Sequence, residues 1–305
     1  MRYSSLLLIL SGVVQGVPIW SQEGKTPVAH ADYQDIVRYA GYPRLSNGDC
    51  STVPSTGATS LQFFNITSTD TQAVLWKLPS EKSILVAIPG TASTTDAITD
   101  IDFFFTQYTS PGVDCQGGCL VHKGFLGAWN SLAEQLIPAL ESALEENPDY
   151  KTIITGHSLG GAIAQLAFGS LSDTTYKVAG AYTYGQPRVG NEAYADYIDS
   201  LAGASSSEAG IFHRVTHYNG NTRLVLPPTE NVMLILKPDG VPLLPPRIFG
   251  FTHSLTEYWE SAETADESTT YRCNGRESLD CNDSAGGFAI NDAHGSYAGF
   301  DLTCE

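Results

Sequence analysis

One pentapeptide, Gly156-His157-Ser158-Leu159-Gly160, constrains the fold and chemistry of this 305-residue chain more than any other feature. It follows a short β-branched run (151–155) and precedes an Ala- and Leu-rich run (159–171) that is typical of a helix. A serine on such a tight strand-to-helix turn needs small neighbours and projects its hydroxyl above the sheet. A chance match on a surface turn is the alternative reading. The strand before and the helix after favour Ser158 as a nucleophile.

Apolar runs on both sides of this turn alternate between strand and helix patterns. Strands are predicted at residues 73–78, 83–88, 178–184 and 212–218. Residues 124–146 have helical apolar spacing, with Pro138 as a possible kink. Together with the Ser158 turn, this alternation predicts an α/β-hydrolase fold, a mostly parallel sheet flanked by helices. We see no repeat or linker and expect one domain over residues 26–305.

The first residues predict a secretion signal. Arg2 gives a positive start, residues 6–14 form a short apolar core, and small residues near Gly16 mark a cleavage site. We therefore expect residues 1–16 to be a signal peptide, cleaved between about 16 and 25, and the mature chain to be extracellular. A buried N-terminal helix is the alternative. The apolar run is too short to span a bilayer, and no later run is long enough to do so.

The strongly acidic composition limits the partners of the chain. The formal net charge is −17, so the surface repels nucleic-acid backbones, and we expect no nucleic acid as a partner. The same charge repels anionic lipid, so any contact with a lipid surface must be mainly apolar. We expect a monomer.

Six cysteines follow the signal segment, an even number that favours three disulfides in a secreted chain. Sequence proximity pairs Cys115 with Cys119 and Cys273 with Cys281, which leaves Cys50 with Cys304. A zinc site is the weaker alternative, because no histidine lies at ligand spacing, and we expect no metal. Acceptor sequons for N-glycosylation begin at Asn65 and Asn282.

A serine nucleophile needs a histidine base, which in this fold class follows an acid later in the chain. His213 and His217 fall in a predicted strand, where a structural role is expected. His253 lies in a loop after a Pro-rich stretch, which suits a base. His294 is the second candidate.

At this point the chain resembles the fungal secreted lipases of class 3 (the Rhizomucor and Thermomyces lipase type), a family that also contains feruloyl esterases. Motifs in the family order run from about residue 32 to residue 304: Ile88-Pro-Gly-Thr91, Val121-His-Lys-Gly-Phe125, Gly156-His-Ser-Leu-Gly160, Tyr184-Gly-Gln-Pro-Arg-Val-Gly-Asn191, Leu244-Pro-Pro-Arg-Ile-Phe-Gly-Phe-Thr-His253 and Glu257-Tyr-Trp259. The resemblance implies His253 as the base and the same three disulfides.

The resemblance also implies an oxyanion hole. Its donors would be the backbone N–H of Leu159 and the residue Thr91, which stabilise the charge on the former carbonyl oxygen. Thr91 as an ordinary turn or helix-capping residue is the alternative. The family usually has Arg before the glycine that precedes Thr91, whereas this chain has Pro89. No cofactor is implied.

The acid departs from the family pattern. Family members have Asp directly after a motif that here reads Thr216-His-Tyr-Asn219, but Gly220 follows instead. The family continuation resumes at Asp239, so we predict an insertion over residues 220–238 with Asp239 as the displaced acid. The insertion is either an added loop or a gene-model artefact. The remaining alternative is a catalytically impaired homologue in which Asp239 is only a turn residue.

In family lipases a short helical lid follows the first oxyanion donor, here about residues 92–106. Ile98, Ile101 and Phe105 would share its apolar face, and typical lipases carry Trp where this chain has Ala97. An amphipathic turn packed on the core is the alternative. We predict a secreted carboxyl-ester hydrolase, a lipase that acts on acylglycerols at a lipid–water interface. A feruloyl esterase acting on plant cell-wall hydroxycinnamate esters is the alternative function.

Overall fold

The computed structural model describes residues 24–44, 57–90, 102–219, 237–285 and 292–302. Its main sheet has the strand order β1-β12-β11-β9-β8-β7-β4-β3-β2, with β10 paired to β9. The strands of this sheet are β1 (Lys25–Pro27), β2 (Thr59–Ile66), β3 (Thr71–Leu78), β4 (Ser83–Ile88), β7 (Lys151–His157), β8 (Val178–Tyr184), β9 (Phe212–Asn219), β10 (Lys237–Pro238), β11 (Glu257–Glu260) and β12 (Thr270–Cys273).

The middle of this sheet is parallel and its edges are antiparallel. Strands β4, β7, β8, β9 and β11 run parallel, whereas β3 and β2 add antiparallel at one edge and β12 and β1 at the other. Every residue of β4 is buried, as expected for a central parallel strand covered on both faces. The α/β-hydrolase fold predicted from the sequence is confirmed.

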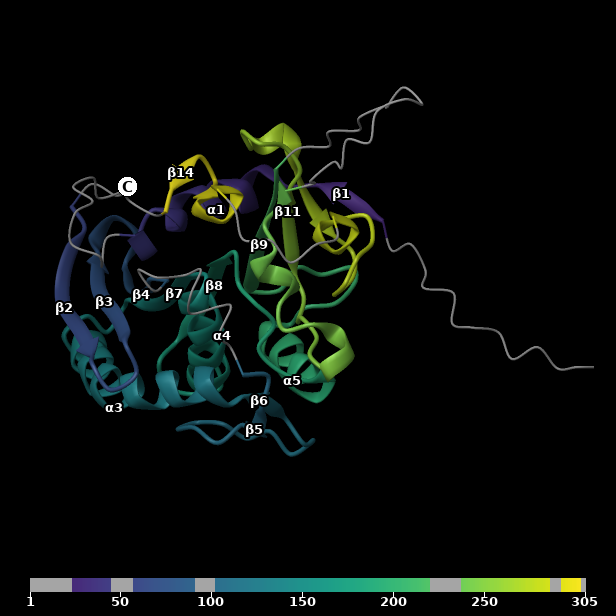
Figure 1. Ribbon diagram of the computed structural model, residues 1–305. Coiled ribbons are helices and arrows are strands. Elements are labelled where there is room, and N and C mark those ends of the chain that lie inside the picture. The colour runs from purple at the N-terminus through teal and green to yellow at the C-terminus, as the bar shows by residue number, and fades with distance from the viewer. Residues whose placement is uncertain (1–23, 45–56, 91–101, 220–236, 286–291, 303–305) are drawn as a thin grey trace, which may run out of the picture.

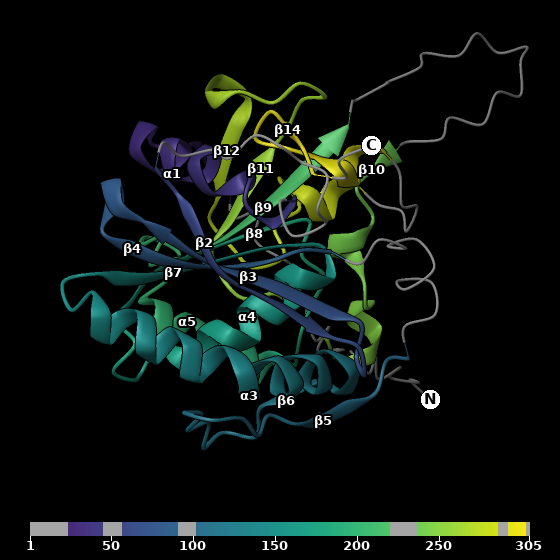
Figure 2. The same ribbon diagram turned by 90° about the vertical axis from the view of Figure 1, so that its left-hand side faces the viewer.

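Helices cover both faces of the sheet. They are α1 (His30–Ala40), α3 (Lys123–Glu146), α4 (Leu159–Leu171) and α5 (Glu192–Ala202). Figures 1 and 2 show α3, α4 and α5 on one face and α1 on the other. Each face has its own apolar core: one includes Trp129 of α3 and Phe168 of α4, and the other includes Tyr39 of α1.

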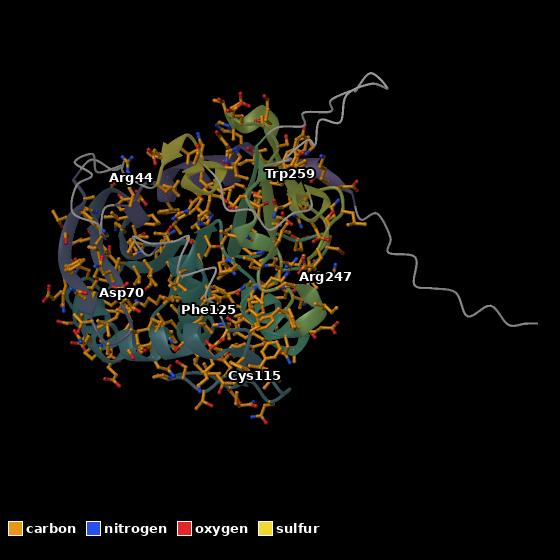
Figure 3. The ribbon with its side chains drawn as sticks, viewed as in Figure 1. Arg44, Asp70, Cys115, Phe125, Arg247 and Trp259 are labelled. Carbon is orange, nitrogen blue, oxygen red and sulfur yellow. A yellow bond between two sulfur atoms is a disulfide. The ribbon has the colours of Figure 1, made fainter. Side chains whose placement is uncertain are left out.

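Short elements complete the described chain. Two small hairpins consist of β5 (Phe105–Gln107) with β6 (Leu120–His122) and of β13 (Ser296–Tyr297) with β14 (Phe300–Asp301). Figure 3 shows Cys115 at the bottom of the molecule, in the loop that joins β5 to β6. The 3-10 turns are η2 (Pro79–Glu81), η3 (Val241–Leu243), η4 (Arg247–Phe249), η5 (Glu267–Thr269), η6 (Asn282–Ala285) and η7 (Asp292–Gly295).

The elements expected around the Ser158 turn are present. Strand β7 precedes Ser158, helix α4 follows it, and α3 continues through Pro138. Residues 220–236 of the predicted insertion lie outside the described residues. The predicted signal segment, before residue 24, also lies outside them. In the described part of the chain, no helix has the length and apolar character needed to cross a membrane.

Two disulfides are confirmed and one predicted pair is untested. Cys115 is bonded to Cys119, and Cys273 to Cys281. Cys50 and Cys304 lie outside the described residues. Because each observed bond joins residues only four and eight positions apart, both close small loops.

Candidate active site

The turn at Ser158 has the strained geometry that its sequence predicts. Ser158 has φ 56° and ψ −127°, in the region that residues other than glycine rarely adopt. A Cβ atom on Gly156 would lie 2.3 Å from the carbonyl oxygen of Gly160. A Cβ on Gly160 would lie 2.2 Å from the carbonyl oxygen of Pro89. Both glycines are therefore required by close backbone contacts, which hold Ser158 at the carboxyl end of β7.

His294 contacts the hydroxyl of Ser158. Its Nε2 lies 2.8 Å from Ser158 Oγ, and its Nδ1 lies 2.9 Å from Oδ2 of Asp239. All three side chains are at most 5% exposed. An imidazole between a serine hydroxyl and a buried carboxylate is the arrangement that activates a serine, because the carboxylate orients the ring and stabilises its protonated form.

His253 does not contact Ser158, which corrects the expectation from the sequence. Its Nε2 lies 2.7 Å from the carbonyl oxygen of Pro242, and its backbone N–H donates to Glu277. Burial and the neighbouring charge of Arg214 hold the pKa of His253 well below its usual value. A ring in these surroundings resists taking a proton, so His253 does not suit a base.

Asp239 lies beside His294 despite the interrupted motif. It is fully buried, and its Oδ1 accepts a hydrogen bond of 3.0 Å from the backbone N–H of Val241. Tyr297 donates its hydroxyl to Oδ2. Burial alone would raise the pKa of Asp239, but the charge of His294 and these hydrogen bonds hold the pKa below its usual value. Asp239 is therefore ionised at neutral pH.

The backbone before Asp239 returns to the sheet. Residues 237 and 238 form β10, which pairs antiparallel with Asn219 and Tyr218 at the end of β9. The backbone N–H of Asp239 then donates to the carbonyl oxygen of His217 at 3.4 Å. The chain thus leaves and rejoins the sheet at the end of β9. Asp239 therefore lies beside the end of this strand.

His157, the neighbour of Ser158, contacts the backbone of His294. Its Nε2 lies 2.7 Å from the carbonyl oxygen of His294, and the two rings are tilted by 33° with centroids 4.8 Å apart. Burial, followed by the charge of His294, lowers the pKa of His157 to about 3. His157 is therefore neutral at physiological pH and donates through Nε2–H to that carbonyl. The sequence did not assign it a role.

The expected oxyanion hole and lid are only partly described. Leu159 is the first residue of α4, next to Ser158, whereas Thr91, Ala97, Ile98 and Ile101 lie outside the described residues. A Cβ on Gly90 would lie 3.1 Å from Ser158 Cβ, so the chain that leads to Thr91 passes directly over the serine.

Phe105 does not belong to a helical lid, which corrects a second expectation. It begins strand β5, which pairs with β6, and its ring stacks on Phe251 with centroids 4.1 Å apart. A residue in an extended strand shares no helical face with Ile98 or Ile101. Phe105 therefore packs on the loop before His253.

The two glycosylation sequons differ in accessibility. Asn65 lies in the edge strand β2 and is exposed. Asn282 is only 3% exposed, beside the Cys273–Cys281 disulfide. A glycan needs an accessible side chain, so Asn282 as the folded chain presents it is not an acceptor. Asn65 stays a prediction.

Fold and site together define a class of protein. A serine on a strained turn, with a histidine and a buried aspartate in one hydrogen-bonded row, on an α/β-hydrolase sheet, is the arrangement of a serine hydrolase.

Comparisons with known proteins identify the family. Residues 85–220 match the family model described as lipase (class 3). The chain is 33% identical to a secreted mono- and diacylglycerol lipase 1 of Fusarium solani over 282 residues, which cover 90% of this chain and 75% of the relative. It is 32% identical to secreted mono- and diacylglycerol lipase A of Penicillium camembertii, over 79% of this chain and 68% of the relative.

Solved structures agree with this match. A lipase from Rhizopus microsporus var. chinensis superposes with a TM-score of 0.75 at 29% identity, covering 92% of both chains. Lipase II from Rhizopus niveus gives a TM-score of 0.74 at 27% identity, over 92% of this chain and all of that one. The chain therefore belongs to the class 3 lipase family, and it is a secreted carboxylic-ester hydrolase.

Proposed function

We propose that this chain hydrolyses acylglycerols through a triad of Ser158, His294 and Asp239. The observation that carries the proposal is the continuous row of hydrogen bonds from Asp239 through His294 to Ser158. His294 replaces His253, which the sequence favoured, as the base. The names of the Fusarium and Penicillium relatives support mono- and diacylglycerols as the acylglycerol substrates.

In the proposed mechanism, His294 removes the proton of Ser158 as the serine oxygen attacks the ester carbonyl. The backbone N–H of Leu159 and Thr91 stabilise the tetrahedral oxyanion, and the adjacent amino end of α4 favours the negative charge. His294 then gives its proton to the leaving alcohol. Water, deprotonated by His294, releases the fatty acid and restores Ser158.

Exposed apolar side chains on turn η4 and on the segment before β5 support contact with a lipid surface. Ile248 is 88% exposed, Phe104 64% and Phe249 53%. Phe249 also contacts Phe103, the neighbour of Phe104, with ring centroids 5.2 Å apart. The contact between Phe249 and Phe103 places turn η4 beside the segment before β5. An apolar contact surface is consistent with an acidic chain, whose net charge disfavours electrostatic binding to anionic lipid.

The experiment measures fatty-acid release from tributyrin as its concentration crosses the solubility limit, with Ser158→Ala as the blank. We expect activity that rises sharply once droplets form. Smooth saturation together with cleavage of methyl ferulate would favour the feruloyl esterase alternative. No activity above the blank would contradict the proposal and favour an impaired homologue.

A second experiment compares substrates and the apolar surface. Monoolein and diolein should be cleaved faster than triolein. Ile248→Ser should reduce the rate on droplets severalfold and leave the rate on a soluble butyrate ester unchanged, since Ile248 lies outside the triad. Light scattering in solution should report a monomer.

A further inference from the structure

Behind the triad, the ring of His217 on β9 lies between two backbone carbonyls. Its Nδ1 lies 3.3 Å from the carbonyl oxygen of Ala293, and its Nε2 lies 2.7 Å from that of Ala262. The backbone therefore contacts the ring on both sides, and this side chain is only 2% exposed.

Glu260 lies on the neighbouring strand. In the parallel pairing of β11 with β9, Glu260 lies directly beside His217. Glu260 is fully buried, and its Oε1 accepts a hydrogen bond of 2.9 Å from the backbone N–H of Ala298. Its Oε2 has no hydrogen-bond partner among the residues that the structure describes. The contact with Ala298 therefore ties this buried side chain to the segment that follows His294.

The two residues hold the segment that carries His294 from both sides. His217 binds the carbonyl of Ala293, immediately before His294, and Glu260 binds the amide of Ala298, four residues after it. The carbonyl oxygen of His217 also accepts the N–H of Asp239. The acid and base of the triad are thus both attached to one position of the sheet.

The charge of Glu260 is sensitive to pH. Burial raises the pKa of Glu260 to about 7, while the charge of His217 and the N–H of Ala298 oppose the rise. The other titratable groups of the described residues that feel the charge of Glu260 are the phenols of Tyr33 on α1, Tyr184 on β8 and Tyr297 on β13. Each of these phenols has a raised pKa and stays neutral.

We propose that His217 and Glu260 act together to position Asp239 and His294 for catalysis. The proposal rests on the proposed triad. Both are positioning residues, since neither touches Ser158 or the substrate. Removing either contact frees one side of the segment that carries His294.

The first test is His217→Gln, assayed on a soluble butyrate ester. We expect kcat to fall by about 10- to 100-fold with KM nearly unchanged, because small displacements of a base are costly. His213→Gln is the matched control. His213 is also a buried histidine of β9, but it packs on Tyr182 and Tyr258, away from the triad. The control should lose stability and keep kcat.

The second test is Glu260→Gln, which keeps the shape of the side chain and removes its charge. In the natural chain, protonation of Glu260 near pH 7 should add a second ionisation to the acid side of the kcat profile. Glu260→Gln should abolish that ionisation and leave a single step. If His217→Gln fails to fold, Glu260→Gln still tests the proposal.

The third test is the double variant His217→Gln/Glu260→Gln. If the residues act as a pair, the double variant should retain at least about threefold more kcat than the product of the two single losses predicts. Additive losses, a two-step profile in Glu260→Gln, or an equal loss of kcat in His213→Gln would overturn the proposal. An inactive natural chain would instead contradict the proposed function, while urea unfolding of the same variants would still report the pair.

Discussion

Two buried histidines of this chain have very different surroundings. His294 lies between the hydroxyl of Ser158 and the carboxylate of Asp239, whereas His253 lies near the guanidinium groups of Arg214 and Arg188. His253 also has a carboxylate, Glu277, but that carboxylate binds the backbone of His253 and not its ring.

The difference shows what makes a buried histidine suitable as a base. A base must gain a proton during the reaction, so it needs an anion in line with its ring. Near His253 the anion is already matched by Arg188, whose guanidinium binds both oxygens of Glu277 at 2.9 and 2.8 Å. The cluster around His253 is a structural support. Arg188 also binds the carbonyls of Leu243 and Pro245, in the segment that follows Asp239.

The largest expected effect separates the two histidines directly. His294→Gln should lower kcat by about 10⁴- to 10⁶-fold, because Ser158 loses its base. His253→Gln should keep kcat within about tenfold and lower the free energy of unfolding by about 1–3 kcal/mol. Ester hydrolysis and urea unfolding of both variants measure this. A dead His253→Gln that folds normally would restore His253 as the base.

The next prediction concerns the acid. Asp239→Asn keeps the size of the side chain but removes the charge that stabilises protonated His294, so kcat should fall by about 10³- to 10⁴-fold. Labelling of Ser158 by an organophosphonate should slow in proportion. A variant with normal kcat would show that the chain has another acid and that Asp239 is only a turn residue.

The third prediction tests the cluster of His253. Arg188→Met removes the cation from the buried Glu277, which should cost about 3–5 kcal/mol of unfolding free energy. Arg247→Met is the matched control, because Arg247 is 37% exposed and its ion pair with Asp283 should contribute about 1 kcal/mol or less. Urea unfolding measures both. Equal losses of unfolding free energy in the two variants would mean that burial does not strengthen the Arg188–Glu277 ion pair.

The fourth prediction uses pH to distinguish the surroundings of His253 from those of His294. The pKa of His253 is lowered by folding, so its contribution to stability is complete above the unfolded value near 6.5 and is lost as pH falls. His253→Gln should flatten the decline of unfolding free energy below pH 6.5 by up to about 1.4 kcal/mol per pH unit. Unfolding curves between pH 7 and pH 4 test this, and parallel curves for the two proteins would contradict it.

The smallest expected effects come from two hydroxyl deletions. Tyr297→Phe removes the hydroxyl that binds Asp239, and Thr252→Val removes one that lies 3.3 Å from Glu277. We expect Tyr297→Phe to lower kcat about tenfold, since a hydrogen bond to a charged group contributes about 1.5–3 kcal/mol. Thr252→Val should change only stability, by about 1 kcal/mol. Similar losses of kcat in both variants would weaken the division between the two regions.

The parts of the site that the sequence predicted depend on local structure. Gly156 and Gly160 are required within one turn, and the strand and helix around them have clear apolar patterns, so the turn at Ser158 was predicted without tertiary information. Asp239, which lies beside His294, was proposed because a recognisable motif resumes there. Asn282 and Phe105 were misplaced because a sequon and an apolar spacing carry no information on burial or pairing.

What the sequence alone determined is therefore the strained turn at Ser158, the mostly parallel sheet and two short disulfide loops, since each follows from residues close together in the chain. What only the tertiary structure decided is which histidine meets the serine. His294 is 136 residues from Ser158 and 55 from Asp239 in the chain. Its neighbours in sequence carry no base-like signature. The segment from Ala293 to Ala298 contacts His157, His217 and Glu260, which strands from distant parts of the chain bring together.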